Sequence, residues 1–113
     1  MTADCLFCKI AGGAIPATIV KRTPRLLAFR DINPQAPTHL LVIPVEHTAS
    51  LDEARDGALL GELLLFARDL ARELGIAAAG YRVVVNTNAD GGQTVAHLHA
   101  HLLGGRSMRW PPG

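Results

Sequence analysis

Residues 86–101 read NTNADGGQTVAHLHAH, and this segment carries the most informative pattern in the chain. A glycine-rich turn stands directly before three histidines at alternating positions, His97, His99 and His101. Successive side chains of a β-strand point to opposite faces, so a strand would place the three imidazoles on one face at intervals of roughly 6.6 Å. A helix would scatter them, because its faces repeat every three or four residues. The pattern therefore predicts a strand with a row of histidines along one face.

The turn at residues 90–94 can direct backbone N–H groups at an anion. Imidazoles beside such a turn suggest chemistry on a phosphate or an acyl group. The alternative is that the histidines form the solvent-exposed face of an edge strand, which histidine tolerates. Three of the five histidines fall within residues 97–101, and this clustering favours a functional site.

The length and composition indicate one folded domain. A chain of 113 residues suffices for one hydrophobic core, so a single domain over residues 1–113 is expected. Hydrophobic residues make up 49% and charged residues 19%, as in globular proteins rather than disordered ones. The formal net charge of +1 gives no electrostatic reason to expect a nucleic acid or an anionic membrane as a partner.

The expected location is the cytoplasm. No apolar run approaches the roughly 20 residues that span a bilayer. The first residues, Met1 to Asp4, contain no basic region followed by an apolar segment, as a secretory signal would. A structural disulfide is not expected in that compartment.

Apolar periodicity and turn residues predict five strands, a short helix and a long helix. The strands are expected at residues 18–21, 26–29, 39–44, 80–88 and the histidine segment. The long helix is expected over residues 50–74, with Ser50 or Asp52 as its N-cap and Gly75 as its stop. The short helix should run from residue 6 to the glycines at 12 and 13. Short connections between strands favour antiparallel pairing, and hence an α+β domain with an antiparallel sheet.

Cys5 and Cys8 form a C-x-x-C pair near the start of the chain. Such a pair is consistent with a redox motif, half of a zinc site, or two small buried side chains. A redox pair usually follows a strand, and nothing precedes this one that could form a strand. Zinc would need two further ligands, for which His47 and one of the three clustered histidines are candidates.

The run at residues 97–103, HLHAHLL, has the form His-φ-His-φ-His-φ-φ, where φ is an apolar residue. The chain also contains LAFRDINPQAPTHLLVIP from Leu27, VVNTNADGGQT from Val84, and GGRSMRWPPG at its C-terminus. In these stretches it resembles the histidine triad nucleotide-binding proteins, and among them the purine nucleoside phosphoramidase branch. The resemblance extends from about residue 5 to residue 113. It implies the fold of the histidine triad (HIT) family, a five-stranded antiparallel sheet with one long and one short helix.

The resemblance implies three catalytic residues. His99 corresponds to the nucleophile that attacks the α-phosphorus of a nucleoside phosphoramidate, giving a nucleotidyl-histidine that water then hydrolyses. His101 corresponds to the companion histidine at the phosphate. Thr94 corresponds to a hydroxyl residue that assists the leaving amine. A neutral imidazole suits the nucleophilic role, because its ordinary pKa lies near 6.5.

The resemblance also implies a set of substrate contacts and a partner. Asp31 would hold the ribose hydroxyls of a purine nucleotide, and the family forms a homodimer in which Trp110 reaches toward the partner's site. The remaining implied contacts are Asn86, Gly92 and Thr94 for the phosphate, and Phe7, Ile10, Phe29 and Ile32 for the purine. For the apolar members of this set, the alternative is an ordinary place in the hydrophobic core.

Zinc is implied as a structural ion. Bacterial relatives of this type carry ligands that correspond here to Cys5, Cys8, His47 and His97. A Cys2His2 set is a closed tetrahedral site, so zinc would stabilise the fold and would not be required for catalysis. His39 resembles a family position near the active site, or else it is a satisfied strand histidine.

Three other functions fit the same residues. The first is a catalytic zinc enzyme in which His97, His99 and His101 all bind the metal, although three ligands from one strand would be strained. The second is a hydrolase of dinucleoside polyphosphates. The third is a regulatory module that binds nucleotides or a protein and turns substrate over slowly.

Overall fold

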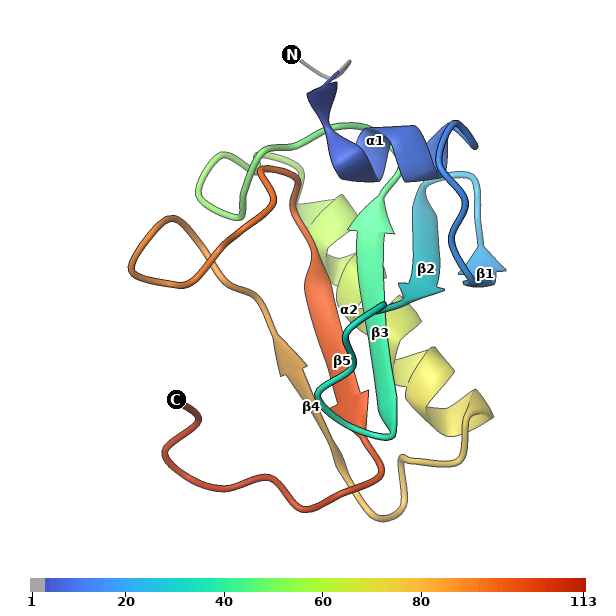
Figure 1. The fold of residues 1–113 in the computed structure, drawn as a ribbon, viewed down its shortest axis with the longest axis vertical. Coiled ribbons are helices and arrows are strands. Elements are labelled where there is room, and N and C mark those ends of the chain that lie inside the picture. Colours follow the sequence, from blue (N-terminus) through green and yellow to red (C-terminus); the bar gives the residue numbers. More distant parts are fainter. Residues whose placement is uncertain (1–3) are drawn as a thin grey trace.

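Seven helices and strands follow one another in the computed structural model, which describes residues 4–113 (Figure 1). They are α1 (Leu6–Ala11), β1 (Ile19–Arg22), β2 (Leu26–Arg30), β3 (Thr38–Pro44), α2 (Gly57–Glu73), β4 (Tyr81–Val84) and β5 (Ala100–Gly104). The expectation about a signal segment concerns Met1, Thr2 and Ala3, which lie outside the described residues. No helix within residues 4–113 is long and apolar enough to cross a membrane.

The five strands form one antiparallel sheet in the order β1-β2-β3-β5-β4. The expected α+β fold is thereby confirmed. The central strand β3 is buried over residues 39–44, as its continuous apolar run predicts. Its partner β5 is the strand that carries His101, which pairs with Leu41. The histidine segment is therefore anchored to the middle of the sheet.

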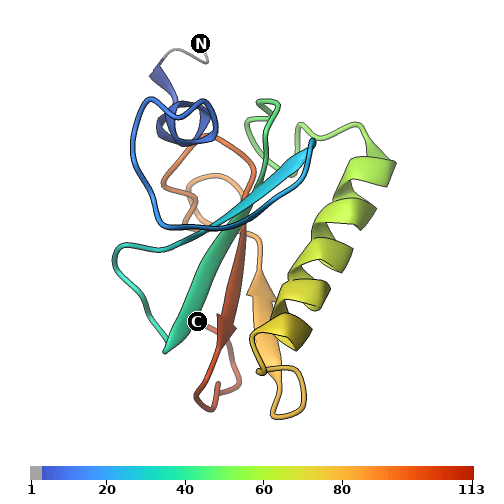
Figure 2. The ribbon, with the colours of Figure 1, turned by 90° about the vertical axis from the view of Figure 1, so that its right-hand side faces the viewer.

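Each face of the sheet has its own apolar cluster. Helix α2 packs on one face, where side chains such as Leu40, Val42 and Leu102 form the larger cluster. Helix α1 lies across the opposite face at one end of the sheet (Figure 2). Its two buried residues, Phe7 and Ile10, pack there against β2 and β3. The alternation of the strands thus divides the molecule into a structural face and a face that holds the histidines.

The long helix begins seven residues later than expected, at residue 57 rather than residue 50. Its N-cap is Asp56, whose carboxylate accepts a hydrogen bond from the Leu59 amide, so the prediction of Ser50 or Asp52 was wrong. Ser50 instead closes a separate turn by accepting from the Glu53 amide. Both residues are good capping types, and the local sequence alone does not decide between them. Gly75 follows the helix with φ of 76°, as its predicted role as the stop requires.

The histidine segment is only partly a strand. Regular pairing begins at Ala100, so His97 and His99 precede β5 and the predicted strand is too long at this end. The His97 amide bonds back to the Val95 carbonyl, and the Leu98 amide donates to Thr48 in a loop. The chain bends here because its backbone partners come from a loop and no longer from β3. Strand β4 is also shorter than the expected 80–88.

Candidate active site and metal centre

A cavity of about 260 Å3 opens beside the histidines on the face that carries α1. The N-terminal segment supplies one wall through Phe7, Ile10 and neighbouring residues, and the tip of β2 supplies another. Eight of the predicted site residues line it, namely Phe7, Ile10, Phe29, Asp31, Ile32, Thr94, His99 and His101. Three predicted residues do not line it, namely Asn86, Gly92 and Trp110. The cavity combines an apolar floor with a polar end, as small-molecule sites usually do.

His99 is buried, and its two ring nitrogens have different surroundings. Its Nδ1 lies 2.7 Å from the carbonyl oxygen of His97, so Nδ1 donates its proton there. The lone pair of the neutral ring is therefore on Nε2. The Phe7 ring packs edge-on against the imidazole, with 5.1 Å between the ring centroids. These two contacts hold one tautomer of His99 in one orientation.

A chain of hydrogen bonds sets the tautomer of His101. The Gln35 backbone amide donates to Nδ1 of His39 over 3.0 Å, so that nitrogen carries no proton. Neutral His39 therefore holds its proton on Nε2, which lies 2.9 Å from Nδ1 of His101. Since His39 donates this proton, His101 carries its own proton on Nε2. The Asp31 carboxylate lies 3.5 Å from the same His39 nitrogen.

Burial keeps both of these histidines neutral. It lowers the pKa of His39 below its ordinary value, and the charge of Asp31 offsets only part of that effect. It lowers the pKa of His101 to about 4, and the positive charges that His99 and His39 would carry add to the shift. At neutral pH, His101 is therefore an uncharged hydrogen-bond donor.

The glycine turn contributes a backbone donor at Thr94. The Gly92 amide is already bonded to the Ala89 carbonyl, and the Gln93 amide to the Asn88 carbonyl. Within residues 4–113, no acceptor bonds the Thr94 amide. Of the two backbone positions predicted for phosphate binding, Thr94 thus has the available N–H group. Gly92 serves the shape of the turn instead, with φ of 82°.

Four side chains from three separate segments converge into a second centre. Nδ1 of His97 lies 3.3 Å from Sγ of Cys5 and 3.4 Å from Sγ of Cys8. Nδ1 of His47 lies 3.2 Å from both Cys8 Sγ and His97 Nδ1. All four atoms lie within 4.8 Å of one another, and both cysteines are free thiols. The structure thus joins all four residues predicted to bind zinc.

The donor set fits a tetrahedral zinc ion. Ligand atoms around such an ion lie roughly 3.3–3.8 Å apart, close to the separations between these sulfur and nitrogen atoms. Nε2 of His97 donates to the Pro44 carbonyl at 2.8 Å, which leaves its Nδ1 lone pair facing the thiols. Burial raises the pKa of Cys8 to about 11, with Cys5 contributing, so a cation is needed there to hold a thiolate.

A second cluster, of Asp31, His39 and His101, also has three candidate ligand atoms within 4.8 Å. A metal on Nε2 of His39 would force the ring proton onto Nδ1. That nitrogen already accepts the Gln35 amide, and two N–H groups would then face each other. This cluster suits proton donation rather than metal binding. The two clusters within residues 4–113 also do not include the ligand set of His97, His99 and His101 that a catalytic zinc enzyme would need.

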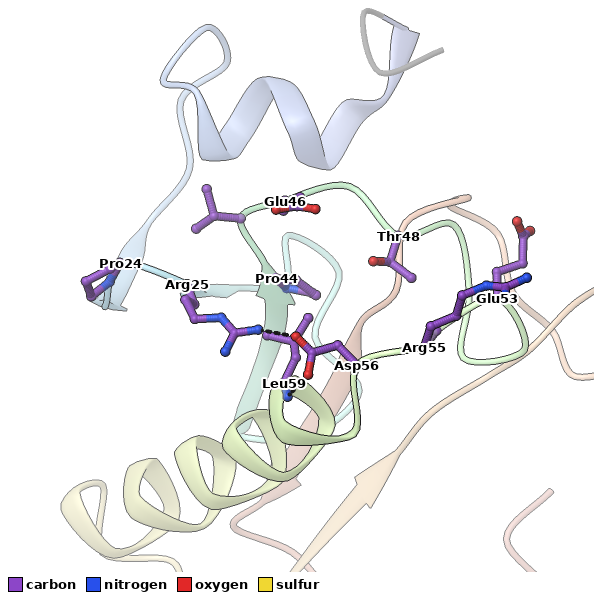
Figure 3. A pocket seen from close by; sticks show the side chains of 11 residues that line it. Pro24, Arg25, Pro44, Glu46, Thr48, Glu53, Arg55, Asp56 and Leu59 are labelled. Carbon is purple, nitrogen blue, oxygen red and sulfur yellow. Dashed lines mark hydrogen bonds and ion pairs between the residues drawn. The ribbon is translucent and has the colours of Figure 1, made fainter.

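Another cavity, of about 310 Å3, lies near the start of α2 and is lined in part by Glu46 and Thr48, the neighbours of His47 (Figure 3). Arg25 projects into it and bonds to Asp56 at 2.7 Å, and it also bonds to Glu62 at 2.9 Å. The positive charge of Arg25 is therefore already paired with the carboxylates of Asp56 and Glu62. We assign no function to this cavity.

His39 and Gln35 are the site residues whose roles the sequence did not reveal. The sequence marked His39 as ambiguous, and no pattern pointed to the Gln35 backbone. Their roles depend on the hydrogen bond from the Gln35 amide, in the loop before β3, to Nδ1 of His39 on β3. This bond indicates which nitrogen of His39 holds the proton, and only the folded structure shows it. Trp110 is 84% exposed, and Asn86 lies just beyond β4.

Comparisons with known proteins identify relatives that match nearly the whole chain. The model of the HIT domain family matches residues 12–108. The 14 kDa zinc-binding protein of Zea mays is 48% identical over 112 residues, which cover 96% of this chain and 87% of that protein. A HIT family hydrolase from Legionella pneumophila has a crystal structure that matches with a TM-score of 0.95 at 55% identity, over 97% of this chain and 100% of that one. A histidine triad nucleotide-binding protein from Candida albicans matches with a TM-score of 0.82 at 32% identity, over 96% of this chain and 83% of that one.

The fold and site define a small α+β protein in which β5 and the residues just before it present two imidazoles, His99 and His101, to an apolar cavity. Because the family model and these relatives match nearly the whole chain, the chain belongs to the HIT domain family.

Proposed function

We propose that this protein is a hydrolase that cleaves the P–N bond of purine nucleoside 5′-phosphoramidates through a nucleotidyl intermediate on His99. One observation carries the proposal. Nδ1 of His99 donates to a backbone carbonyl, which leaves Nε2 as the nitrogen that can carry the lone pair on an imidazole lining the apolar cavity. An imidazole nitrogen in this state is a competent nucleophile near neutral pH.

The reaction then has two steps. Nε2 of His99 attacks the α-phosphorus, the P–N bond breaks with its electron pair on nitrogen, and the Thr94 hydroxyl gives a proton to the departing amine and takes one back from solvent. Water next attacks the phosphorus of the nucleotidyl-histidine and releases a proton to solvent, and the bond to Nε2 breaks with its electron pair on Nε2. The products are a nucleoside monophosphate and ammonia or an amine. His101 donates from Nε2 to a phosphate oxygen in both steps, because its Nδ1 is occupied by His39.

The cavity supplies contacts for the rest of a nucleotide. Phe7, Ile10, Phe29 and Ile32 form an apolar slot that suits a purine ring. Asp31 stands at the rim with one oxygen on the Asn33 amide, and its carboxylate has further lone pairs for ribose hydroxyls. The Thr94 amide and Asn86 would meet the phosphate. The similarity to the histidine triad nucleotide-binding protein from Candida albicans supports this choice of ligand.

We assign structural zinc to Cys5, Cys8, His47 and His97. The tautomer of His97 and the convergence of two thiols support this assignment, as does the zinc-binding relative from maize. The ion would stabilise the N-terminal wall of the cavity and would take no part in the reaction. Two free thiols at such a site suit a reducing compartment such as the cytoplasm.

We also propose a homodimer that joins two sheets along β4. This strand is at the edge of the sheet, and its residues are only partly buried. The C-terminal tail is held against β4 by a 2.8 Å bond from Arg82 to the Arg109 carbonyl. This contact places the exposed Trp110 near that edge, where it can reach the site of a second copy.

A substrate panel tests the proposed reaction. Adenosine and guanosine 5′-phosphoramidates should be hydrolysed to the monophosphate and ammonia, much faster than dinucleoside polyphosphates. Acid-free quenching followed by intact-protein mass spectrometry should show a nucleotidyl adduct on His99. Preferential cleavage of dinucleoside polyphosphates would favour the neighbouring hydrolase activity. Tight nucleotide binding without turnover would favour a regulatory module.

A further inference from the structure

Gln93 lies in the glycine turn, one residue before Thr94, and its side chain bonds to three backbone groups. Its Oε1 accepts the Asn88 amide at 3.0 Å. Its Nε2 donates to the Ala49 carbonyl at 2.8 Å and to the Val95 carbonyl at 3.0 Å. These partners fix which end of the amide is oxygen, because an N–H group needs an acceptor and two carbonyls need donors.

The turn that Gln93 closes is held in an unfavourable conformation. Asn88 has φ of 59°, a region that residues other than glycine rarely adopt. The backbone then passes so close to Thr87 that a Cβ on Gly91 would lie 2.3 Å from the Thr87 carbonyl oxygen. Such conformations persist only where the surrounding contacts hold them. The turn therefore requires anchors of its own.

Gln93 provides these anchors from both its backbone and its side chain. Its backbone amide donates to the Asn88 carbonyl at 3.1 Å, while its side chain accepts from the Asn88 amide. Asn88 is thus held at both of its backbone groups by one residue. The bond to Ala49 also ties the turn to the loop that carries His47. No Gln93 donor is left for a substrate, so any effect on the reaction is transmitted through the backbone.

We propose that Gln93 is a positioning residue that holds the glycine turn so that the Thr94 amide and hydroxyl face the phosphorus attacked by His99. This inference rests on the proposed function, since it concerns the same substrate. A misplaced donor weakens the stabilisation of transition-state charge more than ground-state binding. Loss of the anchors should therefore lower kcat and leave KM nearly unchanged.

The test uses two variants of the 113-residue chain with matched controls. Gln93→Met keeps the size of the side chain and removes all three hydrogen bonds. Gln93→Glu keeps the acceptor for Asn88 but loses both donors. Ala89→Met and Ala89→Glu place the same side chains at an exposed position of the same turn and remove no side-chain hydrogen bond.

Two readouts are measured, namely steady-state hydrolysis of adenosine 5′-phosphoramidate and amide hydrogen exchange at Asn88 by NMR. In Gln93→Met, kcat should fall about tenfold to a hundredfold, KM should stay within about threefold, and Asn88 should exchange at least about tenfold faster. Gln93→Glu should lose kcat while Asn88 keeps its protection. Both Ala89 variants should behave as the wild type.

Three results would overturn the inference. One is a Gln93→Met protein with kcat and Asn88 exchange both within about twofold of the wild type. Another is faster exchange with an unchanged kcat, because the turn would then matter only to the fold. The third is a rise in KM with unchanged exchange, which would indicate direct substrate contact. A wild-type protein that hydrolyses no phosphoramidate would instead refute the proposed function, and the exchange measurement would still show whether Gln93 holds the turn.

Discussion

In the proposed reaction, the two nitrogens of the His99 ring have different roles: Nδ1 anchors the ring and Nε2 is the nucleophile. The anchor is the 2.7 Å bond to the His97 carbonyl, and it depends only on backbone geometry. Removing the ring should leave the cavity almost intact and abolish the chemistry. Substitution of His99 should therefore distinguish nucleotide binding from turnover.

We predict that His99→Ala lowers the rate of phosphoramidate hydrolysis by at least about a thousandfold, as expected when a nucleophile is removed. Nucleotide binding, followed by calorimetry with AMP, should weaken by less than about tenfold. The Ala89→Met protein serves as a control for handling and folding. A His99→Ala enzyme with wild-type turnover would exclude His99 as the nucleophile.

The buried histidines make stability depend on pH in a defined direction. The pKa of His101 is 6.5 in the unfolded chain and about 4 in the fold. Between these values the unfolded chain binds a proton that the folded chain does not, so the free energy of unfolding decreases as the pH falls from about 6.5 to 4. The pKa values of His39 and His97 are lowered in the same direction.

We predict that His101→Gln reduces this pH dependence. Urea unfolding at pH 7.5 and at pH 5.0, with both proteins in the same metal state, should show a smaller loss of stability in the variant. The comparison isolates His101 because the other two histidines titrate in both proteins. Equal losses in the two proteins would contradict the assigned shift.

At the scale of elements, α1 depends on contacts outside itself. A helix of six residues is too short to be stable alone in water. Its N-cap is Cys5, its third residue is Cys8, and its buried Phe7 contacts the rings of both His97 and His99. The candidate metal centre therefore holds one wall of the candidate active site.

We predict that Cys5→Ser loses most of the bound zinc, since a hydroxyl is a much poorer zinc ligand than a thiolate. Inductively coupled plasma mass spectrometry of the purified proteins gives the metal content directly. Thr2→Ser, a change outside the four ligands, is the control. Equal zinc in wild type and Cys5→Ser would refute the assignment of the site.

Strand β4 is the element through which we expect two copies to join. An edge strand exposes unpaired backbone groups, and a second copy of the same strand can pair with them. We predict that wild-type protein sediments as a dimer in analytical ultracentrifugation. Val83→Pro should shift it toward the monomer, because proline removes a backbone donor and disrupts strand pairing. A monomer at all concentrations of wild type would contradict the proposal.

At the scale of the whole molecule, the candidate metal centre and the candidate active site share α1 and the 97–99 segment, but no residue proposed to bind zinc is also proposed to react with substrate. Zinc removal should therefore affect stability more than chemistry. We predict that chelation lowers Tm by at least about 5 °C, as the loss of a ligand bound only to the folded state requires. At a temperature well below the new Tm, kcat should remain within about threefold. Complete loss of activity in a folded, metal-free protein would favour a catalytic metal.

Much of the fold was predictable because it depends on local pattern. The apolar runs at β2 and β3, the periodicity of α2 and the glycine at residue 75 were all read correctly from neighbouring residues. The start of α2 was not predicted correctly, because Ser50 and Asp56 are both capable N-caps and only packing on the sheet selects one of them. The strand predicted through the three histidines was too long at its start, because the Thr48 and Val95 carbonyls, rather than a strand, accept the backbone bonds near His97.

The sequence by itself determined the order of the elements, the clustering of the histidines and the chemical types in both centres. These features follow from composition and spacing, which act over a few residues. Only the tertiary structure decided the proton positions. The Gln35 amide, the Pro44 carbonyl and the His97 carbonyl each contact one ring nitrogen, and those contacts distinguish the proposed nucleophile, the proposed donor and the proposed metal ligand. Identical imidazoles acquire different roles because each ring has one proton, and distant backbone groups determine which nitrogen holds it.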